Sequence, residues 1–278
     1  MTGKCLILLH CRTVRRLWRF HTARSCCSGH GNVINVRPHR SVIDRRHRKR
    51  KGRHISGTAT DACDPPISLA QRMRGRTREL HVLAERSGIV AALLRGQVSR
   101  SCYALYLRNL LPAYQAMEQA LRQNHDRPEF AGLAQPSLYR AESIVADLED
   151  LAGSEWATCL PLLPSGDRYA ARVGSAGRGA TLIAHCYTRY LGDLYGGQVL
   201  GQRLAKRFGP TFRALAFNRF PGIPDLDGFR AAYHANLNRA GDHLADIEAV
   251  VEEAAVAFDL NIQLSLEVDA FRPPDLMM

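Results

Sequence analysis

The stretch Gly-Asp-Leu-Tyr-Gly-Gly at residues 192–197 is the most informative part of the chain, because it places three glycines inside a run, 181–208, that otherwise predicts a helix. Each glycine in a helix interior costs roughly 1 kcal/mol relative to alanine. Gly192 and Gly196 lie four residues apart and therefore share one face. Such a face suits either close packing of another helix or a flat ligand against bare backbone, and the glycines alone favour packing. Asp193 projects beside this gap, which makes it a candidate for proton chemistry.

Helical patterns continue on both sides of this stretch. Ser68 and Gln71 form a capping-box pattern at the start of the first helix, and Pro112 should remove a hydrogen bond from the second helix and bend it. Further helices are predicted over 137–152, 225–239 and about 243–268, and no segment alternates like a strand. Residues 67–270 therefore predict a single-domain, all-α bundle. Its inward positions recur at helical spacing in the first, second and last helices: Leu69, Met73, Thr77, Leu80 and Ala84; Tyr103, Leu107, Leu110, Tyr114, Met117 and Leu121; Ile247, Val251, Ala254, Phe258 and Ile262.

Residues 1–66 differ in composition from the rest of the chain. They hold 15 Lys and Arg but only 3 acids, whereas the other residues hold 23 basic and 23 acidic side chains, so the net charge of +12 belongs to this tail. A basic arm for nucleic acid, an organelle-targeting segment and a disordered extension are the alternatives. Because the tail lacks helical periodicity and the interleaved aromatic residues that stack on bases, we expect a disordered extension and no nucleic-acid partner.

Cysteine and hydropathy patterns bear on the compartment. The chain has no C-x-x-C pair, and the odd number of cysteines outside the tail, Cys102, Cys159 and Cys186, argues against a disulfide framework. No window of about 18 apolar residues predicts a transmembrane helix, and the short C-terminal tail, 271–278, carries no hydrophobic anchor. We therefore expect a soluble, cytoplasmic protein, with organelle targeting by residues 1–66 as the alternative.

Two histidines are candidate metal ligands. His81 lies near the end of the first helix with Glu85 one turn later, and a carboxylate can fix the tautomer of an imidazole that binds a metal through its other nitrogen. The same pair also fits an ordinary surface hydrogen bond. His185 precedes Gly192 by seven residues and falls on a similar face. It is either a second axial ligand or, as we expect, a bystander at the edge of the cleft.

Three motifs resemble the biliverdin-producing heme oxygenase family. They are His81-x-x-x-Glu85, the segment Tyr-Thr-Arg-Tyr-Leu-Gly-Asp-Leu-Tyr-Gly-Gly-Gln at 187–198, and Phe258-x-x-Asn-Ile-Gln at 258–263. They occur in the family's order and with similar spacing over roughly 67–270, and the middle motif is long and unusual. The tail has no counterpart in this resemblance. The family implies a single helical domain that holds heme between two helices.

The resemblance assigns the two faces of that heme to two helices. His81 would be the proximal iron ligand, oriented by Glu85, and Phe258 would contact the ring. The backbone at Gly192 and Gly196 would lie over the porphyrin, which would explain the glycine penalty.

The resemblance also assigns a proton relay. Asp193 would hold an ordered water that supplies protons, and Tyr114, Arg189 and Asn261 match positions of the family's polar network around that water. Each partner also fits a simpler role, which is core packing for Tyr114, a surface ion pair for Arg189 and a helix–helix hydrogen bond for Asn261.

Heme carries two propionates, so the resemblance implies a basic rim. Arg74, Arg230 and Tyr187 match family positions that face propionates, and arginine can bind a carboxylate through two hydrogen bonds. His234 stands where better-known members carry arginine, which weakens one anchor and leaves the oxidised meso carbon open. Tyr195 stands where a small polar residue is common, and its ring either narrows the distal pocket or faces the surface.

The activity implied by the resemblance is oxidative cleavage of heme to biliverdin, ferrous iron and carbon monoxide, with heme b as both substrate and cofactor. No glycine-rich nucleotide loop follows a strand, so electrons would come from a separate ferredoxin or NADPH-dependent reductase. We expect that donor to dock on basic residues such as Arg189 and Arg203. The alternatives are a non-catalytic heme carrier or sensor on the same fold, and a nucleic-acid or membrane-surface protein suggested by the tail.

Overall fold

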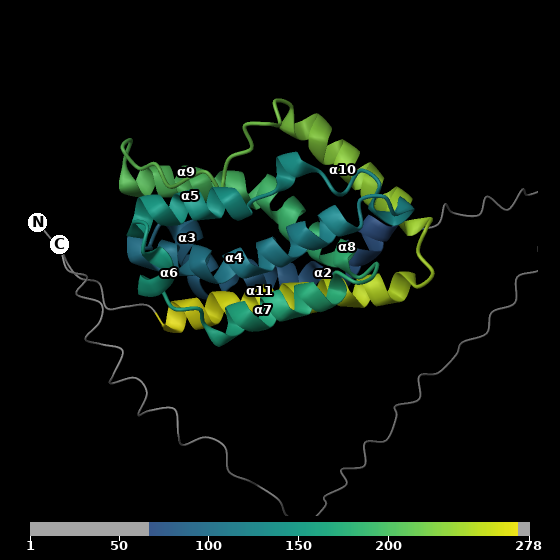
Figure 1. Ribbon diagram of the computed structural model, residues 1–278, viewed down its shortest axis with the longest axis horizontal. Coiled ribbons are helices and arrows are strands. Elements are labelled where there is room, and N and C mark those ends of the chain that lie inside the picture. Colours follow the sequence, from purple (N-terminus) through teal and green to yellow (C-terminus); the bar gives the residue numbers. More distant parts are fainter. Residues whose placement is uncertain (1–66, 272–278) are drawn as a thin grey trace, which may run out of the picture. The chain divides into compact units, whose positions relative to one another are not determined.

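The computed structural model describes residues 67–271, and every regular element within this range is a helix (Figure 1). This confirms the all-α prediction. The expectations for the tail 1–66 and for the residues beyond 271 lie outside the described residues. Within the described range, no helix combines the length and the apolar character needed to cross a bilayer. The helices are α2 (Leu69–Arg86), α3 (Gly88–Arg95), α4 (Arg100–Gln123), the 3-10 turns η2 (Pro128–Phe130) and η3 (Pro136–Leu138), α5 (Ala141–Ala152), α6 (Trp156–Cys159), α7 (Pro164–Ala176), α8 (Leu182–Cys186), the π-helical segments η4 (Tyr187–Leu191) and η5 (Asp193–Gly197), α9 (Gln198–Phe208), α10 (Leu226–Gly241) and α11 (Ile247–Ala270).

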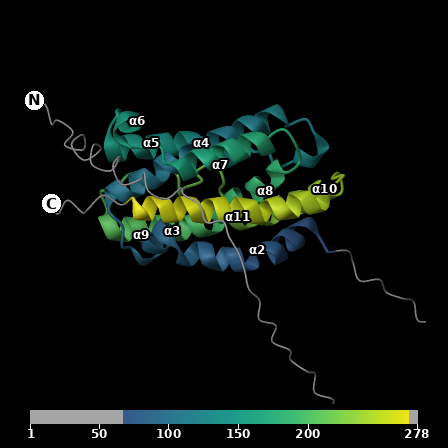
Figure 2. The ribbon, with the colours of Figure 1, turned by 90° about the horizontal axis from the view of Figure 1, so that it is seen from below.

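The long helices α4 and α11 form the centre of the bundle. α4 packs on α5 and α7, and α11 packs on α2, α3, α7 and α8. Figure 2 shows α11, in yellow, running between α2 and α7. All six predicted inward residues of α4 are buried, as are four of the five in α11, with Ile247 half-buried. In α2, Leu69, Met73 and Thr77 are buried, whereas Leu80 and Ala84 are only partly covered because the C-terminal half of this helix borders cavities.

Acidic and hydroxyl side chains set several helix starts. The capping box at α2 forms as predicted, since Ser68 N donates to Gln71 Oε1 over 3.1 Å and Gln71 N donates to Ser68 Oγ over 3.4 Å. The prediction that the last helix begins near 243 is wrong, because Asp246 accepts a hydrogen bond from Ala249 N at 2.9 Å and caps α11 there. The helix predicted over 137–152 also starts later than expected, because α5 begins at Ala141.

The late start of α5 has a tertiary cause. Glu118 of α4 accepts hydrogen bonds from the backbone N–H groups of Arg140 and Ala141, at 2.5 and 3.0 Å, and so satisfies the first free donors of α5. Pro112 lies inside α4, which continues through it as one helix.

Three helices, α3, α6 and α7, lie in segments for which the sequence predicted none. α2 and α3 are separated by Ser87, and Gly88, the first residue of α3, adopts a φ of +54°. A Cβ at this position would lie 2.3 Å from the carbonyl oxygen of Ser265 in α11. Glycine is therefore required here by both the backbone conformation and the close approach of α11.

The predicted helix over 181–208 is helical throughout most of its length but is not a single α-helix. After α8 the backbone widens into the π-helical segments η4 and η5, which are joined at Gly192, and it returns to α geometry in α9. π-helical turns are rare and cluster at functional sites. The widened segment is the one that carries Asp193 and the three glycines.

Candidate functional site

A cavity of about 870 Å³ lies between α2 and the π-helical segments η4 and η5 with Gly192 between them, and residues of α10 and α11 complete its walls. This volume falls within the range of sites for cofactors and other small molecules. Tyr114 and Arg230 are the two predicted site residues that do not line it. The other eleven do: Arg74, His81, Glu85, Tyr187, Arg189, Gly192, Asp193, Gly196, His234, Phe258 and Asn261.

The glycines form a bare stretch of cavity wall. A Cβ built on Gly192 or on Gly196 would meet no atom within 4 Å, so no second helix packs there. The packing interpretation, which the glycines alone favoured, is therefore wrong. The exposed backbone instead faces the open cavity, where a flat group can approach it closely.

His81 stands on the opposite wall, on α2. Its side chain is 59% exposed, its ring centroid lies 5.8 Å from that of Phe258, and its Nδ1 lies 3.6 Å from Oε1 of Glu85. Glu85 thus faces one ring nitrogen and leaves Nε2 available. This division of the two nitrogens is the one that a metal-binding histidine uses.

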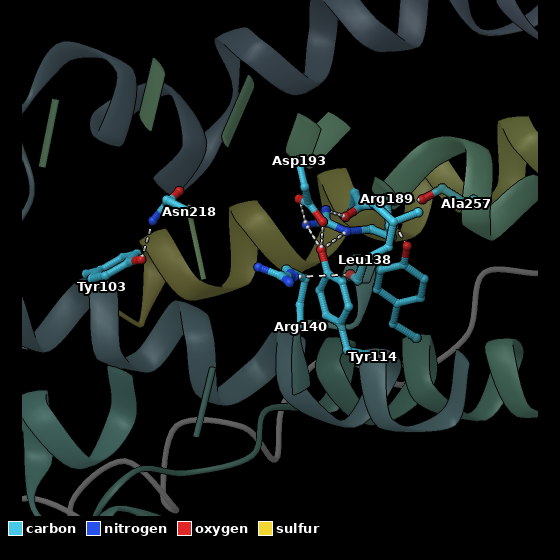
Figure 3. A network of polar contacts seen from close by, with 10 residues as sticks. Tyr103, Tyr114, Leu138, Arg140, Arg189, Asp193, Asn218 and Ala257 are labelled. Atoms are coloured by element: carbon cyan, nitrogen blue, oxygen red, sulfur yellow. Dashed lines mark hydrogen bonds and ion pairs between the residues drawn. The ribbon is translucent and has the colours of Figure 1, made fainter. Parts of the chain in front are cut away.

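Asp193 belongs to a closed network of hydrogen bonds behind the glycine wall (Figure 3). Tyr114 donates its hydroxyl proton to Oδ2 of Asp193. Arg189 donates to the Tyr114 oxygen from Nε and Nη2, at 2.8 and 2.7 Å, and to Oδ1 of Asp193 at 3.1 Å. It also donates to Oδ1 of Asn261 at 2.5 Å. The structure therefore brings together all four residues predicted for the polar network.

Burial governs the electrostatics of this network. It raises the pKa of Asp193, while the Arg189 guanidinium and the Tyr114 hydroxyl act in the opposite direction. The network extends to Tyr169, whose hydroxyl accepts from Nδ2 of Asn261 at 2.8 Å. Tyr169 was not predicted, because α7 itself was not recognised, and no local motif connects it to Asp193.

Basic and polar side chains of α2, η4 and α10 lie along another part of the wall. Tyr187 shares a hydrogen bond with Thr77, and its pKa is raised by burial. The pKa of His234 is lowered, first by burial and then by the positive charge of Arg74. Arg78 also lines the cavity, one turn after Arg74 on α2. It was not predicted, although its spacing from Arg74 and His81 places all three on one helix face.

Arg230 lies outside the cavity lining. Its guanidinium donates to the backbone carbonyl of Leu194 and, at 2.6 Å, to Asp227, and it stacks 4.5 Å from the ring centroid of Tyr195. The two alternatives for Tyr195 were a ring in the distal pocket and a ring at the surface. Both apply, because Tyr195 lines the cavity and is 49% exposed.

The expectation that His185 lies at the edge of the cleft is wrong. Its side chain is fully buried, and its Nε2 lies 2.9 Å from Oε1 of Glu253, which also accepts two hydrogen bonds from Arg172. His185 does not line the cavity and so cannot be a second axial ligand. The α-helical spacing to Gly192 misled the prediction, because the π-helical turns between them hold more residues per turn.

The expected docking of an electron donor on Arg189 is also wrong. The Arg189 side chain is only 13% exposed and its donors are bound to Tyr114, Asp193 and Asn261. Arg203 of α9 is exposed and remains a candidate contact.

The fold and the cavity define an all-helical protein in which a histidine on one wall faces a bare stretch of helix backbone on the other. A family model described as heme oxygenase matches residues 67–267. Heme oxygenase 1 of Pongo abelii is 36% identical over 208 residues, which cover 73% of this chain and 72% of that protein. Heme oxygenase 1 of Synechocystis is 33% identical over 205 residues, which cover 73% and 85%.

Solved structures give the same result. The crystal structure of heme oxygenase-1 from Synechocystis in complex with heme matches with a TM-score of 0.68 and 31% identity, covering 74% of this chain and 94% of that one. The structure of heme oxygenase from Leptospira interrogans matches with a TM-score of 0.68 and 28% identity, covering 72% and 100%. The chain belongs to the heme oxygenase family.

Proposed function

We propose that this chain cleaves heme to biliverdin and releases ferrous iron and carbon monoxide, using oxygen and electrons from a separate protein. The observation that carries the proposal is the buried network of Asp193, Tyr114 and Arg189 beside the bare backbone of Gly192, across the cavity from His81. A heme carrier needs a cavity and a ligand, but it has no use for a carboxylate held in place by two partners. The intact network therefore favours the enzyme over a carrier or sensor.

The residues present fit heme b. The imidazole of His81 offers Nε2 to iron, and Glu85 faces the other nitrogen and orients the ring. Gly192 and Gly196 leave space where a Cβ would otherwise project toward the macrocycle. Arg74 and Arg78 supply positive charge for two propionates, and Phe258 supplies an apolar contact.

Bound heme supplies the iron that activates oxygen and the macrocycle that is oxidised. The chain supplies position and protons. Arg189 and Tyr114 hold both oxygens of Asp193, so a water bound to that carboxylate is held in one orientation and can pass a proton toward the heme. Burial shifts the pKa of Asp193 upward, toward the range where a carboxyl group can both accept and return that proton.

Electrons would come from a ferredoxin or an NADPH-dependent reductase, with Arg203 as a candidate contact on the exposed surface. We also propose a reducing compartment, the cytoplasm, since Cys102 and Cys186 are buried thiols of the helical bundle.

The test is to mix the purified full chain with hemin, oxygen and a reductant, and to identify the pigment by chromatography. Biliverdin is the expected product, and its isomer reports how the heme is rotated. A chain that binds hemin with a Soret band but forms no bile pigment is a carrier, and the proposal would then be wrong.

A further inference from the structure

Gly197 differs from the other two glycines of the distal stretch, because it is buried whereas Gly192 and Gly196 are exposed. A Cβ built on Gly197 would lie 3.8 Å from Cβ of Asp193 and 3.9 Å from Oδ1 of Asn218, and both are ordinary van der Waals distances. Gly197 also lines the cavity. The missing side chain therefore leaves a methyl-sized space that adjoins Asp193, Asn218 and the cavity.

Asn218 presents a polar atom without a partner to this space. The residue is 3% exposed, and its Nδ2 donates to the Tyr103 hydroxyl at 2.9 Å, but its Oδ1 is buried and accepts no hydrogen bond from any described residue. Rotating the amide by half a turn would place Nδ2 at the same point and leave that atom equally unpaired. A buried polar atom without a hydrogen bond costs free energy, and buried waters commonly satisfy such atoms.

The protein fixes Asn218 in place without any ligand. The backbone carbonyl of Asn218 accepts a hydrogen bond from Nε2 of Gln198, at the start of α9, over 3.1 Å. The two residues before it are held by the buried carboxylate of Asp147, which accepts from the N–H groups of Ala216 and Phe217 at 2.8 and 2.9 Å. The loop between α9 and α10 therefore carries the unpaired amide atom to a defined position.

Tyr103 and Asn218 form a neutral pair beside the Asp193 network. Figure 3 shows no hydrogen bond that joins this pair to Asp193 among the residues drawn. Burial raises the pKa of the Tyr103 hydroxyl, and the charges of Asp147 and Asp193 act in the same direction. The pair is therefore uncharged at neutral pH and can order a water without competing for the proton of Asp193.

We propose that Asn218 binds a buried water in the space beside Gly197, and that this water belongs to the hydrogen-bonded chain that supplies protons to Asp193. The second part rests on the proposed function, because only turnover consumes those protons. A proton that leaves Asp193 toward the ligand is replaced through this water, which recovers its own proton from solvent through the cavity. Tyr103 is a positioning residue, since it holds the Asn218 amide.

The first test uses crystals of the ligand-free full chain. The parent should show a water about 2.9 Å from the Asn218 amide atom that faces Gly197. Gly197→Ala should lose this water because the methyl group takes its space, and Asn218→Leu should lose it because the polar atom is gone. Tyr103→Phe should keep the water, since the amide remains. A parent structure without a water at this point would overturn the proposal.

Gly197→Ala should fold at least as well as the parent chain. Its added Cβ makes only ordinary contacts, and alanine favours a helix over glycine, so the melting temperature of the ligand-free variant should not fall. The matched control is Gly174→Ala in α7, where an added Cβ would meet no atom within 4 Å and where the cavity is not lined.

In turnover, Gly197→Ala and Asn218→Leu should each form biliverdin about tenfold more slowly, while hemin affinity stays within about threefold of the parent value. The ratio of rates in H₂O and D₂O should rise in both, because proton supply becomes the slower step, and Gly174→Ala should change neither quantity. Parent-like rates and isotope ratios in both variants would show that this water supplies no protons. If the parent chain binds hemin but makes no biliverdin, the proposed function fails, while the ligand-free crystals still decide whether Asn218 binds a water.

Discussion

The two walls of the cavity hold their polar side chains in opposite ways. On α2, Arg74 and Arg78 make no hydrogen bond or ion pair with any residue in the described range, and Nδ1 of His81 lies 3.6 Å from Oε1 of Glu85. On the distal wall, the single side chain of Arg189 donates hydrogen bonds to three residues, Tyr114, Asp193 and Asn261.

The contrast does not come from a shortage of acids near α2. Arg72 and Arg76, on another face of the same helix, pair with Glu248 and Glu252 of α11, and the second pair is bidentate at 2.8 and 2.9 Å. These four arginines of α2 occur at every second position, and the helical period therefore places them alternately on two faces of the helix. Two bind the neighbouring helix, and two are left for the cavity.

This difference between the two walls suggests that the α2 wall recognises the ligand and that the distal wall carries out the chemistry. The cationic side chains of the α2 wall have no partner within the described residues, and a bound heme would provide one. We therefore expect these side chains to become ordered only when the ligand binds. The distal wall has its partners within the protein, so Asp193 is in place before any ligand arrives. A catalytic group that is fixed in advance needs no rearrangement at the moment of reaction.

The largest expected effect is on the distal wall. Asp193→Asn removes a group that can accept and return a proton, and general acid–base groups contribute about 10²- to 10⁴-fold to rate. Biliverdin formation should fall by that factor, measured by single-turnover absorbance, while hemin affinity stays within about threefold. If the variant formed biliverdin at the parent rate, the distal wall would have no chemical role.

The second prediction tests whether the distal side is held in place without ligand, through the contribution of Glu253 to the stability of the chain. Glu253 is 3% exposed and bound to His185 and Arg172, and although burial raises its pKa, these partners lower it to about 2. Its folded pKa lies below the unfolded value of 4.5, so its contribution to stability is present above pH 4.5 and is lost as pH falls toward 2. Glu253→Gln should reduce the free energy of unfolding at pH 7 by about 3 kcal/mol.

Urea unfolding of the ligand-free chain across pH 2 to 7 measures this effect. The parent should lose stability between pH 4.5 and 2 more steeply than Glu253→Gln does. The matched control is Glu252→Gln, the adjacent residue, whose pair with Arg76 is at the surface and should contribute little. Equal pH profiles for the parent and Glu253→Gln would show that the buried carboxylate does not stabilise the distal side.

The α2 wall should show the reverse behaviour. His81→Ala removes the iron ligand, so hemin affinity should fall by up to about 100-fold and the Soret spectrum should change. The melting temperature of the ligand-free chain should be unchanged, because the His81 side chain is 59% exposed. Added imidazole should restore the spectrum in part. An unaltered Soret band would remove His81 as the ligand, and buried His185 could not replace it.

The smallest effect belongs to the rim. Arg78→Gln removes one cation from the cavity wall and should weaken hemin binding by roughly tenfold, with a smaller effect on hemin dimethyl ester, because the lost interaction is with a carboxylate. Arg76→Gln, one helix face away and paired with Glu252, is its control and should not alter hemin affinity. Equal losses for both variants would assign the effect to helix stability instead of recognition.

Local signals predicted much of this architecture. The capping box at Ser68, the buried stripe of α4 and the all-α class follow from spacing along one helix, which the sequence records directly. The first residues of α5 and α11 were predicted less accurately from the local sequence. Glu118, which caps α5, lies 22 residues before Arg140, and no local pattern connects the two.

Residue spacing was enough to predict that Gly192, Asp193 and Gly196 share one unusual helical segment and that His81 and Glu85 lie one turn apart, because both statements are local. Four other features became visible only in the folded chain: the glycines face open space, Tyr169 joins the network, His185 is buried with Glu253, and Arg230 contacts Leu194. These outcomes depend on π-helical turns and on contacts between distant elements. Side-chain direction there is set by packing, which periodicity along a single helix does not encode.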